Sequence, residues 1–142
     1  MQNVTVESER EVRLKRGSYR IETTDWPLVL LTTEGDITPA DLERHLAEYR
    51  SLLDRNMPFA VVYDASKIGR VDAHIRRRYA EFHQENNDDF RRLCRGIGFV
   101  ITSSLVRGAL TAVLWMVELP FPYKIFATKE EAAAWTRRQL WR

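Results

Sequence analysis

The side chains best suited to catalysis or metal binding are few and widely separated along this chain. They are three histidines, His45, His74 and His83, and a single cysteine, Cys94. No two of them have the short spacing that is typical of paired metal ligands, so we expect no metal site. Cys94 would act as a nucleophile only if a distant histidine approached it. A lone cysteine just before an apolar strand is more typical of a buried packing residue.

Glycine-rich phosphate-binding motifs and nucleophile motifs give no sign of catalysis either. Gly96-Ile97-Gly98 lacks the third glycine of a dinucleotide-binding turn and stands at the start of an apolar run rather than after one. We interpret these two glycines as positions where the backbone packs closely against its neighbours. The sequence contains no P-loop and no Gly-x-Ser-x-Gly pattern. We therefore expect no cofactor, and a protein that binds rather than catalyses.

Polar side chains follow two of the predicted strands, and each group leads into a predicted helix. Asp64 and Ser66 come directly after the apolar run at residues 59–63, and Ser104 comes shortly after residues 97–102. If both strands are parallel, the two helix N-termini lie at one edge of the sheet. Free backbone N–H groups and the helix dipoles favour an anion there.

A basic residue in the first turn of the second helix, Arg107, strengthens this interpretation. A cation is disfavoured near a helix N-terminus, so we expect Arg107 to pair with a negative group. This group is either Asp64 or an incoming carboxylate or phosphate. We expect an acidic partner segment or an anionic ligand at this edge. The candidate binding residues are Asp64, Ser66, Arg70, His74, Ser104 and Arg107.

The rest of the chain is organised around a strand–helix–strand unit at residues 95–127. Its helix, predicted over residues 105–118, begins after two serines that can accept from free backbone N–H groups and ends before Pro120. Apolar residues cover about two-thirds of its circumference, far more than the ~100° stripe of an ordinary surface helix. One sheet cannot cover so wide an arc. Another helix, a bound apolar ligand or a second subunit must cover the remainder.

These possibilities lead to two hypotheses about function. A contiguous exposed apolar surface usually marks an interface, which predicts a homodimer through this helix. Its predicted contact residues are Leu110, Leu114, Trp115 and Val117. If the same arc instead faces a cavity, the protein is a carrier or sensor of a small apolar or anionic ligand.

Start and stop signals divide the remaining chain into alternating strands and helices. Thr38, Asp72 and Thr128 are predicted to cap three helices, because their side-chain oxygens can accept from free backbone N–H groups. The apolar run at residues 59–63 predicts a central strand that is buried on both faces. Residues 86–89 interrupt the helix that Asp72 begins. Alternating segments before residue 36 predict an antiparallel meander, and residues 1–16 form either a polar segment or an edge strand.

Composition and charge indicate one globular domain, which we place at residues 17–142. The chain has 142 residues and a formal net charge of only +2, and its basic clusters lack interleaved exposed aromatic residues, so we predict no nucleic-acid partner. No stretch reaches the ~20 apolar residues of a membrane span, and the charged N-terminus does not resemble a signal peptide. One cysteine permits no intrachain disulfide. We expect a cytoplasmic protein.

Two segments resemble a known superfamily. The run from Phe59 to Ser66, followed by a helix from Asp72, is similar to the STAS-like superfamily, and the run from Pro122 to Trp135 resembles its SpoIIAA-like branch. The resemblance implies a small α/β domain with a mixed sheet of about five strands and helices mainly on one face. It also implies a non-enzymatic regulatory or scaffolding module that acts through protein–protein interaction.

The same resemblance draws attention to the start of the helix after the central strand. In anti-sigma antagonists of this superfamily, a phosphorylatable serine follows an aspartate there. The corresponding residues here are Asp72, Ala73 and His74, so the hydroxyl is missing. We therefore predict no serine switch at this place, and His74 is the side chain there that could carry a phosphoryl group in its stead.

Overall fold

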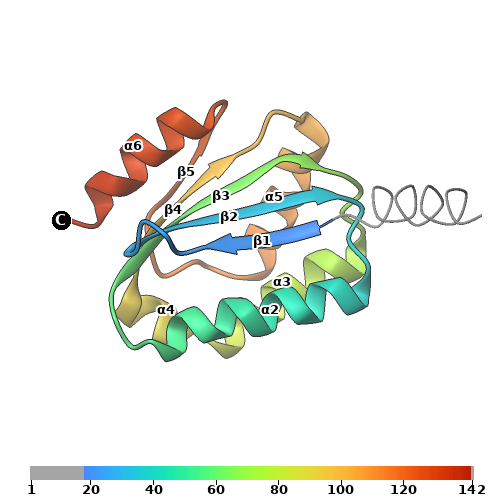
Figure 1. Ribbon diagram of the computed structural model, residues 1–142. Helices are drawn as coiled ribbons and strands as arrows, with labels where there is room; N and C mark the ends of the chain where they lie inside the picture. The colour runs from blue at the N-terminus through green and yellow to red at the C-terminus, as the bar shows by residue number, and fades with distance from the viewer. Residues whose placement is uncertain (1–17, 142) are drawn as a thin grey trace, which may run out of the picture.

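A mixed five-stranded sheet forms the middle of the structure, a computed structural model that describes residues 18–141 (Figure 1). The strands lie in chain order, with β1 antiparallel to β2 and the following neighbours parallel. They are β1 (Ser18–Glu22), β2 (Leu28–Gly35), β3 (Phe59–Ile68), β4 (Cys94–Val100) and β5 (Tyr123–Phe126). The edge strand suggested within residues 1–16 lies outside the described residues.

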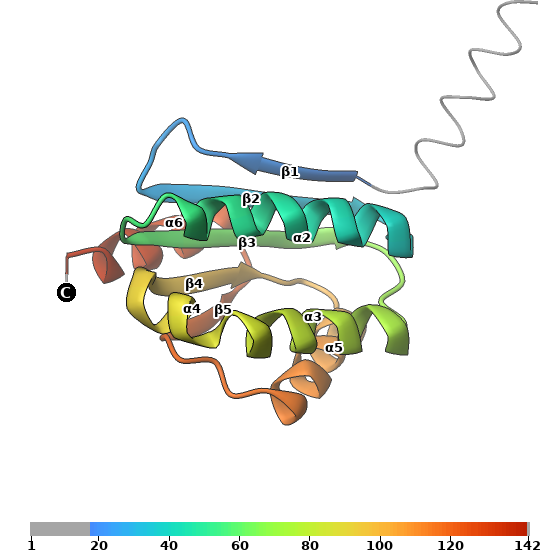
Figure 2. The ribbon, with the colours of Figure 1, turned by 90° about the horizontal axis from the view of Figure 1, so that it is seen from below.

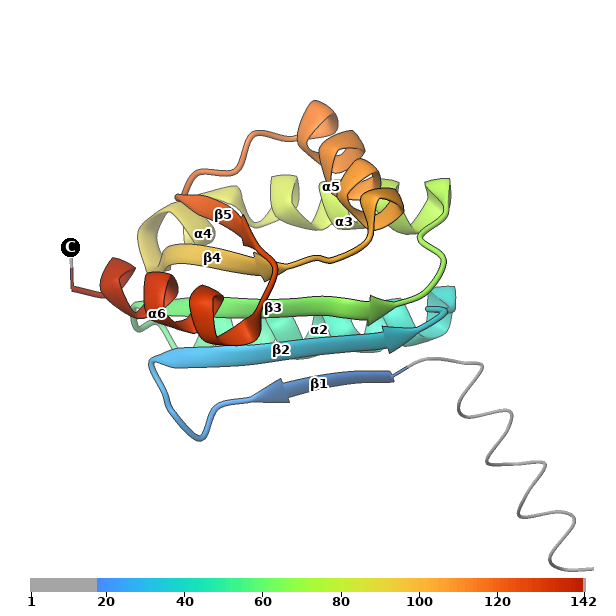
Figure 3. The same cartoon turned by 90° about the horizontal axis from the view of Figure 1, so that it is seen from above.

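The helices form two unequal layers, so the expected arrangement with helices mainly on one face is confirmed. They are α2 (Pro39–Asp54), α3 (Ala73–Glu85), α4 (Asn87–Leu93), α5 (Ser104–Met116) and α6 (Lys129–Gln139). Helices α2, α3 and α4 cover one face of the sheet, and α6 lies across the other (Figures 1 and 3). Helix α5 packs beside α3 near the β4–β5 side of the sheet (Figure 2). Within residues 18–141, no helix is both long and apolar enough to cross a membrane.

Side chains of the central strands alternate between a large core and a small one. On β3, Val61 and Tyr63 belong to the large core beneath α2, α3 and α4, whereas Val62 belongs to the small core beneath α6. Both faces of this strand are covered, which explains the almost continuous apolar run in its sequence. The prediction of a central strand that is buried on both faces is confirmed.

Hydrogen-bonding side chains begin the helices at the predicted places. Thr38, Asp72 and Thr128 each accept a hydrogen bond from the backbone N–H three residues ahead, at 3.1, 3.1 and 3.2 Å. Ser103 caps α5 by accepting from the N–H groups of the second and third residues after it, at 3.2 and 3.4 Å. The predicted interruption at residues 86–89 is also confirmed, because α3 ends at Glu85 and α4 follows.

Strand β3 is longer than the sequence predicted. It continues to Ile68 instead of ending at Tyr63, because β2 pairs with it as far as Gly35, which lies opposite Ile68. Asp64 therefore lies within a paired strand, opposite Thr32, and not in a loop beyond the sheet edge. This difference decides where its carboxylate can reach.

Candidate binding surfaces around helix α5

The structure separates the predicted binding residues into different parts of the molecule. Asp64 accepts hydrogen bonds from the backbone N–H of Ser66 at 3.0 Å and from its hydroxyl at 2.6 Å. Both residues line a polar recess of about 140 Å³ on the α6 side of the sheet, together with Lys129 of α6. The other lining residues are Arg20, Thr32, Thr33, Glu34 and Lys67.

The suggested ion pair between Arg107 and Asp64 is wrong. Arg107 belongs to α5, which packs against α3 on the opposite side of the sheet from the Asp64 recess. Its side chain is exposed and has no hydrogen bond or ion pair with any residue between 18 and 141. Ser104 is the first residue of α5 and is also exposed, and the cap of this helix is its neighbour Ser103.

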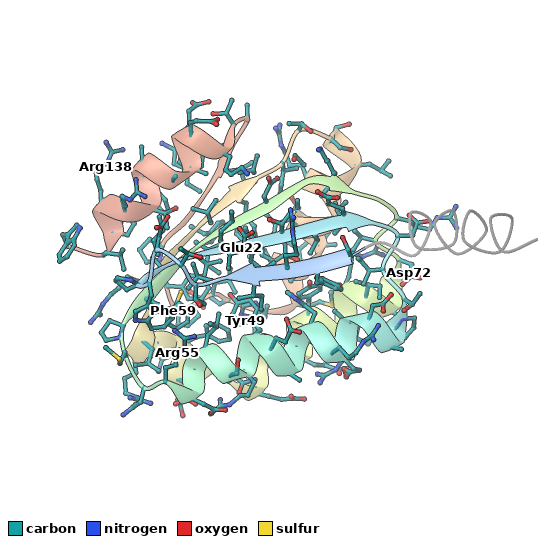
Figure 4. The ribbon with its side chains drawn as sticks, viewed as in Figure 1. Glu22, Tyr49, Arg55, Phe59, Asp72 and Arg138 are labelled. Carbon is teal, nitrogen blue, oxygen red and sulfur yellow. The ribbon has the colours of Figure 1, made fainter. Side chains whose placement is uncertain are left out.

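Two further predicted residues lie on the connection between β3 and α3 and at the start of α3. The backbone N–H of Arg70 donates to the carboxylate of Asp36 at 2.7 Å, which fixes the connection against the end of β2. His74 is exposed in the first turn of α3, after the capping residue Asp72, which is labelled in Figure 4. Ala73, the position at which the hydroxyl is missing from the sequence, is exposed as well.

Helix α5 has an inner side and an outer side, and both are apolar. None of its thirteen residues, all of them described, is fully buried. Of the predicted contact residues, Leu110 lines a cavity between α5 and the sheet and Val117 is buried, so these two pack within the chain. Leu114 is half-buried, and Trp115 is 86% exposed.

The outer side of α5 forms a continuous surface. We call it the α5 face and define it by Leu105, Gly108, Ala112, Trp115 and Met116, which lie on one side at 100° per residue. Leu105 is 82% exposed, and an added Cβ at Gly108 would meet nothing within 4 Å. Part of this face borders a groove of about 320 Å³ that separates α5 from the β3–α3 connection.

The inner side of α5 faces a cavity of about 90 Å³ between α5, α3 and the sheet. The described residues that line it are almost wholly apolar, and none of them is charged. Tyr49 of α2 projects into the core between its helix and the sheet, as Figure 4 shows, and is one of the lining residues. The others of aromatic type are Tyr63, Tyr79, His83 and Phe99.

Two polar atoms of this lining have no hydrogen-bond partner among residues 18–141. They are the hydroxyl oxygen of Tyr49 and Nδ1 of His83, and both atoms are buried. Burial lowers the pKa of His83 to about 4, so its imidazole is neutral at pH 7. By contrast, the hydroxyls of Tyr63 and Tyr79 bond to each other at 2.7 Å. Only a weak signal for this site is present in the sequence, namely a polar group on the apolar stripe of each of two helices.

Cys94 is a buried packing residue, as its position before an apolar strand favoured. It is buried at the start of β4, and burial raises the pKa of its thiol to about 12, which leaves it protonated and unreactive at neutral pH. Within residues 18–141, no three histidine, cysteine, aspartate or glutamate side chains gather closely enough to hold a metal ion.

Comparison with known proteins identifies the family. The family model described as SpoIIAA-like matches residues 28–137. This chain belongs to the SpoIIAA-like family. No curated protein sequence matches the chain.

Two solved structures show the same fold in other members of this structural class. An uncharacterized protein from Shewanella loihica with a SpoIIAA-like fold superposes with a TM-score of 0.59 at 17% identity, covering 85% of this chain and 94% of its own. An anti-sigma factor antagonist from Mycobacterium paratuberculosis gives 0.57 at 13% identity, covering 87% of this chain and 96% of its own. At these identities the likeness concerns the fold.

Proposed function

We propose that this SpoIIAA-like protein is a non-enzymatic regulatory or scaffolding module that binds proteins through the α5 face. Its family, and the likeness of its fold to that of an anti-sigma factor antagonist, support a role in protein interaction. We choose the α5 face as the binding surface because exposed apolar side chains are concentrated on α5. Of the six large hydrophobic side chains exposed in the described chain, three belong to this helix: Leu105, Trp115 and Met116.

Exposed apolar side chains favour binding because removing them from water is favourable in free energy. A large apolar side chain contributes about 1.5–3 kcal/mol when it is moved from water into a packed interface. Leu105 and Trp115 are 82% and 86% exposed, so most of this free energy is still available for binding. Contiguous apolar surface of this kind usually marks an interaction site.

A second copy of the chain is the partner that this face fits best. Leu105 and Trp115 stand at opposite ends of the stripe, ten residues or about 15 Å apart along the axis. In an antiparallel two-fold pair, each Leu105 would lie against the partner's Trp115. The small residues Gly108 and Ala112, between them, would let the two helices approach closely. Arg107 is the only charged residue of α5, so little charge repulsion opposes the pairing.

The oligomeric state tests this proposal directly. Size-exclusion chromatography with light scattering on the full chain at about 50 μM should give twice 16.7 kDa. Trp115→Ser should shift the mass to that of the monomer. Trp141→Ser is the matched control, because Trp141 is 83% exposed but lies outside α5, and it should leave the dimer intact. A monomeric wild-type protein, or a dimeric Trp115→Ser variant, would exclude self-association through this face.

A second candidate function, the carrier or sensor of a small ligand, is supported by a different observation. The inner side of α5 lines a cavity and not a packed interface, and two residues of the lining, Tyr49 and His83, each carry a buried polar atom without a hydrogen-bond partner among the described residues. Ligand sites in proteins are typically apolar hollows with a few such polar groups. This candidate does not depend on the α5 face, since it uses the other side of the helix.

A further inference from the structure

The cavity beneath α5 is a gap that the chain itself does not fill. Four side chains of α5 line it from one side: Val106, Ala109, Leu110 and Val113. None of them is fully buried, and α5 packs mainly against α3, although Val106 and Leu110 also contact the large core. An unfilled apolar space is unfavourable, because the atoms around it lose dispersion contacts on that side. An apolar molecule of suitable size would restore those contacts.

The shape and chemistry of the lining restrict what that molecule can be. Five aromatic rings line the space, and such rings pack favourably against another ring. They belong to Tyr49, Tyr63, Tyr79, His83 and Phe99. An engineered apolar cavity of about 150 Å³ holds benzene. The cavity here, about 90 Å³, would admit a single ring after a small outward movement of α5. No residue of this described helix is fully buried, so such a movement disturbs only partly buried contacts, chiefly those of Val106 and Leu110 with the large core.

Polarity restricts the ligand further. The Tyr49 hydroxyl and Nδ1 of His83 are buried without a hydrogen-bond partner among the described residues, and Tyr49 is only 2% exposed. A buried polar group without a partner is costly, so a ligand atom that bonds to either group would relieve that cost. None of the described residues that line the cavity is charged. A carboxylate would lose its hydration without gaining a counter-charge, which disfavours an anionic ligand in this cavity.

We propose that this cavity binds a small neutral aromatic molecule that carries one hydroxyl group, an inference that rests on the carrier function given above as the second candidate. The ring occupies the apolar space between α5 and the sheet, and its hydroxyl bonds to the hydroxyl of Tyr49. The site lies on the inner side of α5 and uses none of the residues that define the α5 face.

The experiment titrates the full chain with three probes of similar size: p-cresol, toluene and benzoate. Binding is followed by isothermal titration calorimetry. We expect saturable binding of p-cresol, about tenfold weaker binding of toluene, and no binding of benzoate. Tyr49→Phe should weaken p-cresol binding about tenfold or more while leaving toluene unchanged. This variant removes a hydroxyl that has no hydrogen-bond partner among the described residues, so it should fold normally.

A matched pair of substitutions on α5 locates the site. Ala109→Leu places three extra carbon atoms in the cavity and should abolish p-cresol binding. Ala112→Leu makes the same change on the outer side of the helix and should leave binding intact. The proposal fails if p-cresol does not bind, if toluene or benzoate binds as tightly, or if Ala109→Leu binds as well as Ala112→Leu. A monomeric protein that binds p-cresol would exclude self-association but retain this inference.

Discussion

His45 illustrates how a titratable residue can serve as a packing ring. It is only 1% exposed, and its imidazole stacks on Tyr19 with ring centroids 3.9 Å apart. The rings of Tyr49, Tyr63 and Tyr79 surround it edge-on. Neither imidazole nitrogen has a hydrogen-bond partner among residues 18–141, and burial lowers the pKa of His45 to about 3. The residue is therefore neutral in the folded protein at any pH near 7.

This environment predicts acid sensitivity. The unfolded chain binds a proton at His45 below pH ~6.5, whereas the folded chain does not until about pH 3, so stability is complete above pH 6.5 and falls as the pH drops below that value. Between pH 7.5 and pH 5, this one residue should cost about 2 kcal/mol of unfolding free energy. His45→Phe retains the stacked ring and should remove that part of the loss. Urea unfolding at the two pH values measures it, and an unchanged pH dependence in the variant would show that His45 is accessible to protons in the folded state.

At the scale of the element, α5 is held mainly at its N-terminus and along α3. The Ser103 hydroxyl accepts from two backbone N–H groups of the first turn, whereas the next serine, Ser104, has no such capping bond among the described contacts. No residue along its described length is fully buried, although Val106 and Leu110 contact the large core, so we expect the cap to contribute measurably to its local stability.

The two serines therefore form a natural pair of test and control. Ser103→Ala should destabilise α5 by about 1 kcal/mol, the usual cost of losing a helix cap. Ser104→Ala should have a much smaller effect, because alanine is well tolerated within a helix. Amide hydrogen exchange of residues 105–116 measures the local opening, which should become about five times more frequent in the first variant only. Equal exchange in both variants would mean that the cap does not limit the opening of α5.

The same helix shows what could and could not be predicted from the sequence. Its existence and its start were predictable, because a capping serine, an apolar run and a following proline act within a few residues. The cavity beneath it was not, because it depends on how far α5 stands from strands that are distant in sequence. The predicted position of Asp64 was wrong for a related reason. The pairing of β3 with β2 extends the strand, and the alternation of side chains then turns this carboxylate toward α6 and away from Arg107.

For the molecule as a whole, the two layers of helices are attached to the sheet very differently. The large core joins three helices to one face, whereas α6 alone covers the other face through a small core that contains Ala132 (Figure 3). The small contact area between α6 and the sheet is compensated by a close approach of the helix to strand β4. An added Cβ at Gly98 of β4 would clash with the Thr136 hydroxyl and lie 3.1 Å from the carbonyl oxygen of Ala132. The glycines that the sequence suggested as close-packing positions have that role here.

Gly98→Ala should therefore weaken the attachment of α6. The new methyl group meets the backbone of a helix and a fully buried threonine, so α6 must move outward, and overpacking of this kind costs about 1–3 kcal/mol. Gly108→Ala is the matched control, because a methyl group there meets nothing within 4 Å and should stabilise α5 by up to about 1 kcal/mol. Urea unfolding at low micromolar concentration should move the midpoint down for the first variant and slightly up for the second. If Gly98→Ala were as stable as the wild type, α6 would be able to shift without loss, and the small core beneath it would contribute little to the fold.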